Sequence, residues 1–398
     1  MLHWHHQGVD HQAAWRSESG LPAPRRVVVA DDTLSADTAY RLACEGTALL
    51  WQGDFQNARH LLDALKRRLD KPARKPAGKA ARKPAGKAAG RGKPRPGAEP
   101  VSPAQAFHLH RQAQGQRARV LNSLLVPLQP DYGMQLRRAP DWREACTQAW
   151  GAPSGDAGVQ AVALRELLGV VGAYEWRKKG VAMPVLGAQA RIHPHYGVFS
   201  PVRGEYVDLV AQAPLPAAGQ ALAFDIGVGT GVLSALLVQR GVRQVVGTDL
   251  SPRALACAQD NLQRLGLTQR VQLQACDLFP EGQAGLIVCN PPWLPARAVT
   301  TLEQAVYDEH SAMLRGFLTG LRAHLLPQGE GWLILSDLAE HLGLRSRAEL
   351  LDWIEAAGLQ VVGKLDVRPR HGKAQDASDP LHAARTQEVT SLWRLQAR

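Results

Sequence analysis

The sequence predicts an α/β protein whose C-terminal half is built on a mostly parallel sheet and whose N-terminal half is mostly helical. Three features of the C-terminal half support this fold class. A β-like run at residues 221–226 leads through a glycine turn into a helix. A second β-like run at 244–248 ends in Asp249, and a continuous apolar run at 286–289 ends in Asn290. Short apolar runs that alternate with helical segments are typical of βαβ units, and an unbroken apolar run is typical of a strand buried on both faces.

The glycine turn, Gly227-Val228-Gly229-Thr230-Gly231, joins the first strand to a helix that starts at Val232. Glycine lets the backbone approach a ligand closely at a helix N-terminus. The spacing G-x-G-x-G differs from the dinucleotide-binding spacing G-x-G-x-x-G, so the turn alone is weak evidence. Asp249 strengthens the interpretation, because an acidic residue at the tip of the second strand can accept hydrogen bonds from both ribose hydroxyls. A third strand, at 271–275, leads to Asp277.

The most informative motif is Asn290-Pro291-Pro292-Trp293, which follows the buried strand. Open α/β sheets bind ligands at the carboxyl ends of their strands, so we expect this motif to lie at the ligand-binding site. The two prolines stiffen the backbone. The Asn290 side-chain carbonyl can accept a hydrogen bond from an amino group, and the flat indole of Trp293 can stack on a planar group. The motif therefore predicts a site that holds a conjugated amino group and leaves its lone pair free for reaction.

Together these motifs resemble those of class I S-adenosylmethionine-dependent methyltransferases, over roughly residues 195–398. The resemblance implies a Rossmann-like seven-stranded sheet in a methyltransferase domain at 191–398, with S-adenosylmethionine as the cofactor. It also implies that Asn290, Pro291, Pro292 and Trp293 form the catalytic motif of an amino-nitrogen methyltransferase. The cofactor contacts that it implies are Asp225, Gly227, Gly229, Thr230 and Gly231 at the methionine part, Asp249 at the ribose, Asp277 and Leu278 beside the adenine, and in addition Phe199, Leu250 and Asn290.

Two groups within this class share further residues with the chain. The segments Tyr196-Gly197-Val198-Phe199-Ser200-Pro201 and Gly231-Val232-Leu233-Ser234 resemble the methyltransferase small-domain family, which includes ribosomal RNA guanine methyltransferases. In that family the first of these segments packs over the cofactor. Residues 305–308 and 314–321 resemble the release-factor glutamine methyltransferases. Those enzymes usually have tyrosine where this chain has Trp293, and a proline-arginine-x-glutamate stretch where it has residues 201–205.

Residues 1–190 resemble neither group. The histidine-rich, polar residues 1–30 are expected to form a disordered lead-in. Residues 37–69 carry two apolar stripes at helical spacing, broken at Gly53-Asp54, and predict a helical hairpin that resembles one tetratricopeptide unit. Further helices are expected at 102–125, 141–150 and 159–175. Residues 31–190 are therefore expected to form a mostly helical domain.

A basic segment of low complexity, residues 71–100, interrupts this helical domain. Residues 71–96 hold ten lysine and arginine residues and no acidic residue, and so carry nearly all of the net charge of +11. Proline, glycine and like charges cannot build a core, so we expect the basic segment to be disordered. It is either an inert insertion or a segment that binds RNA phosphates, and the sequence leaves both open.

The remaining elements complete the C-terminal sheet. We expect helices at 204–210 and 347–357, and strands at 331–335, 359–367 and 388–395. The loop at 368–385 carries six arginine, lysine and histidine residues. In the fold that the chain resembles, such a loop borders the substrate opening.

The sequence also argues against several other function classes. It holds no G-x-S-x-G elbow and no P-loop lysine. The five cysteines form no C-x-x-C pair, which indicates free thiols in a reducing cytoplasm. No run of 18 apolar residues occurs, so we expect no membrane-spanning helix and no membrane partner. His193 and His195 have no further ligand at metal-site spacing, so we expect a structural role for them and no metal.

The leading hypothesis is an enzyme that methylates an amino nitrogen in the translation apparatus, with RNA, the ribosome or a translation protein as partner. An RNA base amino group and a glutamine amide both fit the motif. The alternatives are a small-molecule amine methyltransferase and, from a different class, a non-catalytic RNA-binding protein with a vestigial methyltransferase fold. The sequence leaves open the methyl acceptor, the function of the N-terminal domain and the oligomeric state.

Overall fold

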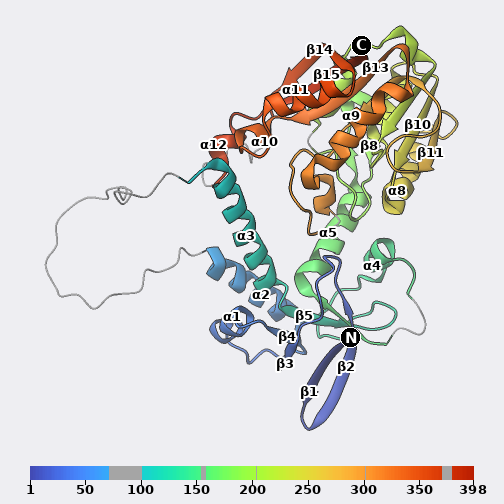
Figure 1. The fold of residues 1–398 in the computed structure, drawn as a ribbon. Coiled ribbons are helices and arrows are strands. Elements are labelled where there is room, and N and C mark those ends of the chain that lie inside the picture. Colours follow the sequence, from blue (N-terminus) through green and yellow to red (C-terminus); the bar gives the residue numbers. More distant parts are fainter. Residues whose placement is uncertain (71–100, 154–157, 203, 301, 370–378) are drawn as a thin grey trace.

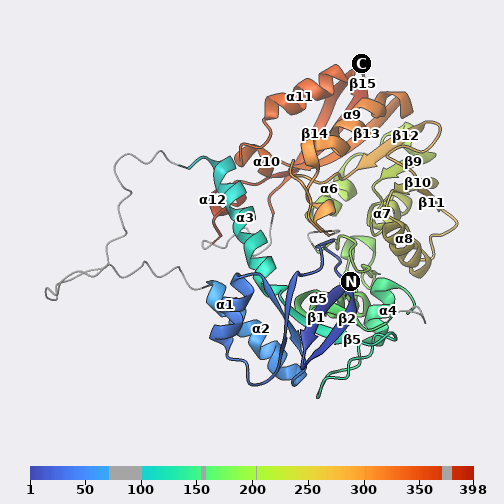
Figure 2. The same ribbon diagram turned by 60° about the horizontal axis from the view of Figure 1, so that its bottom comes forward.

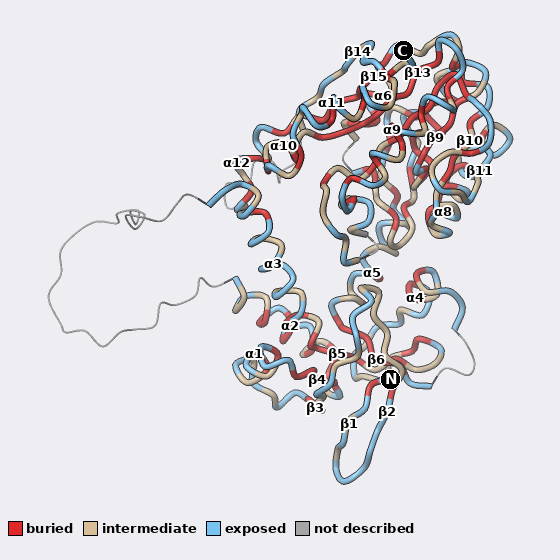
Figure 3. The backbone as a smooth tube through the Cα atoms, viewed as in Figure 1, coloured by how far each residue is buried: buried red, intermediate tan, exposed pale blue. Residues whose placement is uncertain are grey.

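The computed structural model describes residues 1–70, 101–153, 158–202, 204–300, 302–369 and 379–398. Figure 1 shows two α/β units: an N-terminal unit that ends with helix α5 (Leu164–Lys179), and a C-terminal unit after it. Buried residues gather within each unit, so each has its own core (Figure 3). The basic segment lies outside the described residues, and its expected disorder stays a prediction. None of the described helices is long and apolar enough to cross a membrane.

The C-terminal unit contains the seven-stranded sheet that the sequence predicts. Its strands are β9 (Leu222–Ile226), β10 (Gln244–Asp249), β11 (Val271–Ala275), β12 (Ala284–Cys289), β13 (Leu325–Ser336), β14 (Leu359–Val367) and β15 (Thr390–Ala397). Their order is β11-β10-β9-β12-β13-β15-β14, and β15 is antiparallel to both of its neighbours. The other pairs are parallel. The strand order reverses between β9 and β12, and open α/β sheets bind ligands at such a switch point.

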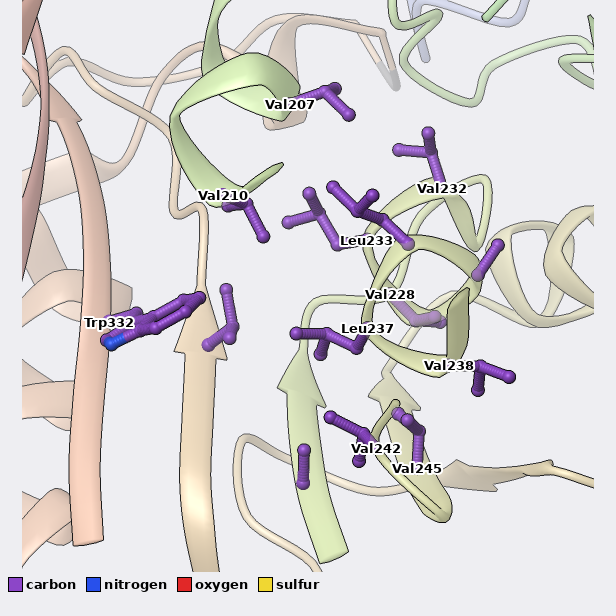
Figure 4. Packing of buried hydrophobic residues seen from close by; sticks show 14 of the residues in the cluster. Val207, Val210, Val228, Val232, Leu233, Leu237, Val238, Val242, Val245 and Trp332 are labelled. Carbon is purple, nitrogen blue, oxygen red and sulfur yellow. The ribbon is translucent and has the colours of Figure 1, made fainter. Parts of the chain in front are cut away.

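Helices cover both faces of this sheet (Figures 1 and 2). On one face, α6 (Glu205–Gln212), α7 (Val232–Gln239) and α8 (Pro252–Arg264) pack in one apolar cluster, and Figure 4 shows α6 and α7 side chains gathered with Trp332. On the other face lie α9 (Ala312–His324) and α11 (Arg347–Ala356). Two short helices, α10 (Leu338–His341) and α12 (His382–Arg385), pack beside Phe107. Strands buried between two helical layers explain the unbroken apolar runs in the sequence.

The N-terminal unit is an α/β structure, so the prediction of a mostly helical domain is wrong. Its strands are β1 (Leu2–His6), β2 (Val9–Arg16), β3 (Arg26–Ala30), β4 (Thr47–Trp51), β5 (Leu124–Leu128) and β6 (Gln160–Ala163). They form one sheet in the order β1-β2-β6-β5-β4-β3. Its helices besides α5 are α1 (Ala36–Cys44), α2 (Phe55–Asp70), α3 (Pro103–Leu121) and α4 (Arg143–Trp150).

Short, fully buried strands caused this error. Helix α1 ends at Cys44, Gly46 turns the chain with a φ of +80°, and all five residues of β4 are buried. A strand buried on both faces shows no alternation, so its apolar residues continue the apparent stripe of the helix before it. For the same reason, the start of β5 and all of β6 fall within the helices that the sequence predicts at 102–125 and 159–175. The resemblance of 37–69 to a helical repeat unit is therefore wrong.

The expected disordered lead-in at residues 1–30 is also wrong. Strands β1 and β2 form a hairpin whose two-residue turn is Gln7-Gly8, with φ values of +50° and +78°. Positive φ at both turn residues is the geometry that matches the twist of hairpin strands. Leu2 is fully buried and anchors the hairpin in a small apolar cluster. The many histidines on the exposed face of β1 and β2 concealed this pattern in the sequence.

Contacts at two places join the units. The carboxylate of Glu18 accepts a hydrogen bond from Arg253 of α8 at 3.1 Å, and Arg177 of α5 contacts Asp260 of α8 at 3.0 Å. At the other place, Phe107 of α3 packs in the cluster that includes α10 and α12. Both ribbon views show α3 reaching from the N-terminal unit to α12 (Figures 1 and 2).

Candidate active site

The glycine turn and the Asn290 motif start side by side. Ile226, the last residue of β9, pairs with Cys289, the last residue of β12. Both residues are fully buried, so the two strand ends are held firmly in the core. Gly227 and Asn290 therefore begin at the same edge of the sheet, at the point where the strand order reverses.

The turn has a backbone that requires glycine. Gly227, Gly229 and Gly231 have φ values of +75°, +53° and +81°, in the left-handed region that other residues rarely adopt. A Cβ on Gly231 would also lie 3.3 Å from Ala258. The N–H groups of Gly227 and Val228 both donate to the carbonyl of Thr248, at 2.9 and 2.8 Å. The turn is therefore bound to the end of β10 and leads directly into α7.

Asp225 lies beneath the turn and faces inward. Its carboxyl is 1% exposed and accepts a hydrogen bond from the hydroxyl of Ser234 at 2.6 Å. The pKa of Asp225 is raised to about 6, chiefly by burial and in smaller part by the charge of Asp249, whereas the hydrogen bonds from Ser234 lower it. Asp225 is among the cofactor residues expected from the sequence, whereas no motif in the sequence indicates that Ser234 holds its carboxyl.

Asp249 connects the glycine turn to the next helix. One oxygen of its carboxylate accepts from the N–H of Gly229 at 3.1 Å, and the other accepts from the N–H of Ser251 at 2.9 Å. Each oxygen keeps a free lone pair for a further donor. Leu250, the next residue, is an apolar side chain with 67% exposure. A carboxylate and an exposed apolar side chain thus lie together beside the turn.

The third strand places Asp277 and Leu278 near β10. Asp277 is exposed, and Leu278 has a φ of +60°, which is strained for a residue with a side chain. The carbonyl of Leu278 accepts from the hydroxyl of Thr248 at 2.5 Å, which ties this loop to the same residue that anchors the glycine turn. Backbone strain of this kind is typically found at functional sites.

Asn290 and Trp293 contact each other. The indole Nε1 of Trp293 donates to Oδ1 of Asn290 at 2.9 Å, a hydrogen bond that the sequence analysis did not foresee. An amide oxygen has two lone pairs, so this bond orients the Asn290 amide and leaves one acceptor position. Pro291 is buried, whereas Asn290, Pro292 and Trp293 are half-buried.

The loop after the motif is anchored by a residue that the sequence analysis did not select. The N–H of Asp308 donates to the carbonyl of Leu294 at 2.9 Å. Its buried carboxylate accepts from the N–H groups of Met313 and Leu314 at 3.0 and 3.1 Å, at the start of α9. Asp308 thus fixes the loop that follows Trp293 to a helix of the core. The sequence signal that could have identified Asp308 is its place in the segment 305–308, which resembles the release-factor glutamine methyltransferases.

Residues 189–342 match the family model of the methyltransferase small domain. This match supports the prediction that the C-terminal unit is a class I S-adenosylmethionine-dependent methyltransferase. The chain is 33% identical over 168 residues to a release factor glutamine methyltransferase of Cereibacter sphaeroides, in a match that covers 38% of this chain and 58% of the relative. It is 31% identical over 121 residues to the tRNA1(Val) (adenine(37)-N6)-methyltransferase of Cytophaga hutchinsonii, which covers 28% of this chain and 50% of the relative.

Among solved structures, a ribosomal protein L11 methylase from Lactobacillus delbrueckii subsp. bulgaricus is similar, with a TM-score of 0.36 and 18% identity. That alignment covers 55% of this chain and 91% of the other. The chain spans only about half the length of these two curated relatives. The family match confirms the predicted methyltransferase class and its cofactor, whereas the roles of single residues stay predictions.

The family match includes the segment 196–201, where Phe199 is expected at the cofactor. Phe199 is half-buried, and the N–H of its neighbour Val198 donates to the carbonyl of His195 at 3.1 Å. The His195 ring contacts Asp260 at 3.0 Å, and the His193 ring contacts the carbonyl of Arg177 at 2.6 Å. Both histidines thus have structural partners. Among the described residues, no cluster of three or more histidine, cysteine or acidic side chains could hold a metal ion.

Proposed function

We propose that the C-terminal unit transfers a methyl group from S-adenosylmethionine to a planar amino nitrogen, with a component of the translation apparatus as acceptor. The observation that carries this proposal is the pairing of Ile226 with Cys289, which starts the glycine turn and the Asn290 motif at one edge of the sheet. A cofactor-binding turn and an amino-binding amide can act on each other only when they lie together.

The residues around the turn fit this cofactor. At Gly229 the backbone is bare where a ligand approaches, since a Cβ there would meet no atom closer than 3.9 Å, whereas the Met313 side chain covers Gly227, where a Cβ would lie 2.9 Å from the Met313 methyl. The free lone pairs of Asp249 suit two ribose hydroxyls, and exposed Leu250 suits the apolar face of an adenine or ribose. When bound, the cofactor supplies an electrophilic methyl group on a sulfonium sulfur.

The motif residues would bind and orient the acceptor. The remaining lone pair of Asn290 Oδ1 accepts one N–H of the acceptor amino group, and the carbonyl of Pro291 accepts the other. Two acceptors favour a pyramidal nitrogen and stabilise the positive charge that develops there. The hydrogen bond from Trp293 holds the Asn290 amide in the orientation that this requires. No strong base is needed, because the protonated product is acidic.

The relatives support an acceptor in translation. One is named as a glutamine methyltransferase of release factors, and another as an adenine-N6 methyltransferase of a tRNA. Both a glutamine amide and a base amino group are conjugated NH2 groups, which the same pair of acceptors on Asn290 and Pro291 can hold. We therefore propose an RNA base amino group or a protein glutamine amide as the acceptor class.

The test is a methyl-transfer assay on fractions of a strain that lacks the protein. Purified protein and tritium-labelled S-adenosylmethionine are incubated with ribosomal, RNA and protein fractions, and the labelled material is then digested with nuclease or protease. We expect label in one macromolecular fraction, and none when that fraction comes from cells that contain the protein. Absence of label from all fractions, with the cofactor bound, would contradict an acceptor in translation.

A further inference from the structure

Helix α5 presents one face to a cavity of about 590 Å³ that lies between the two units. Arg165, Gly169, Ala173 and Trp176 line this cavity from α5, and their spacing places them along one side of the helix. From the C-terminal unit it is lined by the segment around Tyr196, Val198 and Ser200, and by Thr300 of the loop after the Asn290 motif. Its volume falls within the range of ligand-binding clefts, which often form where domains meet.

Arg165 and Trp176 lie at the two ends of this helical face, and Trp176 has a cation–π contact with Lys179, whose Nζ lies 5.8 Å from the ring centroid. Arg165 makes no hydrogen bond or ion pair with any residue that the structure describes, although it lies beside Glu166 in sequence. Trp176 lines the cavity and is 50% exposed, which is unusual for an indole. By helix geometry the two residues lie roughly 16 Å apart along α5. Between them, Gly169 leaves the helix surface bare, since a Cβ there would meet no atom within 4 Å.

The acidic residues of the cavity are already engaged. Glu18 pairs with Arg253 at 3.1 Å. The carboxylate of Glu166 accepts hydrogen bonds from the hydroxyls of Ser17 and Ser19 and from the N–H of Glu18. The charge that remains available on this wall is therefore the guanidinium of Arg165. An unpaired cation and an exposed aromatic ring, separated by a bare strip of helix, suit a ligand that carries both an anion and a flat ring.

The cavity also touches polar atoms without partners. Oδ1 of Asn122 and Oγ of Ser200 are buried without a hydrogen-bond partner among the described residues, and both residues line the cavity. Buried polar groups usually have a hydrogen-bond partner, so a ligand with donors and acceptors at its edge could supply the missing hydrogen bonds. A nucleotide has such an edge as well as the ring and the anion.

We propose that this cavity binds a short single-stranded segment of RNA, with a base stacked on Trp176 and a phosphate on Arg165, and that it guides the acceptor base towards Asn290. This inference rests on the proposed function and narrows its acceptor class to RNA. The length of the helical face fits a few nucleotides in a row, since single-stranded RNA is bound by aromatic platforms that alternate with cationic groups. Thr300 connects the cavity wall to the loop that follows Trp293.

The test measures binding of a fluorescein-labelled, 12-nucleotide single-stranded RNA of mixed sequence to the full chain, by fluorescence anisotropy at several salt concentrations. Trp176→Ala should weaken binding about tenfold through lost stacking. Gly169→Leu should do the same by filling the strip between Trp176 and Arg165. Gly115→Leu is the matched control, because Gly115 lies in helix α3 with equally open space and does not line the cavity. Both leucine substitutions favour helix, so neither should unfold the protein.

Arg165→Gln should lower the slope of log affinity against log salt by about 0.7, the value for one phosphate contact on a single strand. All variants keep the basic segment, so any binding by that segment cancels from the comparison. Equal affinity of parent, Gly169→Leu and Gly115→Leu proteins would overturn the proposal. Methylation of a glutamine peptide that is unaffected by Trp176→Ala would overturn it too, while leaving N-methyl transfer intact. Expected RNA binding together with full activity of Asn290→Ala would instead refute the catalytic role and leave the cavity assignment standing.

Discussion

Asp225 offers a quantitative test of how the site is built. The carboxyl is buried beneath the glycine turn, and burial raises its pKa from 3.8 to about 6. At pH 7 the folded protein therefore holds an ionised carboxylate in a place that disfavours its charge. Asp225→Asn removes the charge and keeps an oxygen that can accept from Ser234. We expect this variant to be more stable than the parent at neutral pH.

The pH dependence follows from the direction of the pKa change. A raised pKa means that the folded state keeps its proton up to about pH 6, whereas the unfolded state loses it near pH 3.8. Between these values the unfolded state binds fewer protons, so this group lowers the free energy of unfolding as pH rises. Its full cost, on the order of 3 kcal/mol, is reached only above pH 6. The advantage of Asp225→Asn over the parent should grow by about 2 kcal/mol between pH 4.5 and pH 7.

Hydrogen exchange of the β9 amides measures this difference without assuming that both units unfold together. Exchange is followed by mass spectrometry at several pH values in cofactor-free protein and corrected for the intrinsic rate at each pH. The same variant should bind S-adenosylmethionine more weakly than the parent at pH 7, because a negative charge near its ammonium group is lost. If the stability difference between the variant and the parent stays constant from pH 4.5 to pH 7, the claim that burial disfavours the charged form of Asp225 is refuted.

Two further predictions concern residues on either side of the site. Asp249→Ala should weaken cofactor binding by about 1.5–3 kcal/mol for each ribose hydrogen bond lost, and unchanged affinity in calorimetry would remove the ribose assignment. Trp293→Phe keeps an aromatic ring but removes the N–H that holds Asn290, so it should lower kcat by about tenfold with little change in cofactor affinity, as expected for one lost neutral hydrogen bond. A Trp293→Phe enzyme with the parent's kcat would show that the Trp293–Asn290 hydrogen bond does not position the amide.

The C-terminal fold could be predicted because its sequence signals are local. Glycine marks the turn after β9, an acidic residue ends β10, another follows β11, and Asn290 follows β12. Since parallel strands end at one edge of a sheet, these local signals also bring the candidate residues together. The N-terminal sheet was missed because β4, β5 and β6 are four or five residues long and buried throughout or almost throughout. Such strands carry no period-two signal and adjoin helices with apolar stripes.

The contacts within the site depend on features that a motif does not encode. The inward orientation of Asp225 towards Ser234 and the bond from Trp293 to Asn290 depend on side-chain rotamers. Asp308 lies 14 residues beyond Leu294 and anchors the motif loop through its own N–H and through its carboxylate, which binds two N–H groups of α9. The cavity between the units joins residues as distant in sequence as Glu18 and Thr300. Only the packed structure reveals these neighbours.

The most direct test of the central claim compares the parent with Asn290→Ala in two measurements on the same preparation. Cofactor affinity is measured by calorimetry, and methyl transfer is measured with tritium-labelled S-adenosylmethionine on the acceptor fraction. We predict that transfer falls by about 10²–10³-fold, the usual cost of losing one preorganised hydrogen-bonding group, while cofactor affinity stays within about threefold of the parent. Full transfer by Asn290→Ala would contradict the assignment of the acceptor nitrogen to the Asn290 motif.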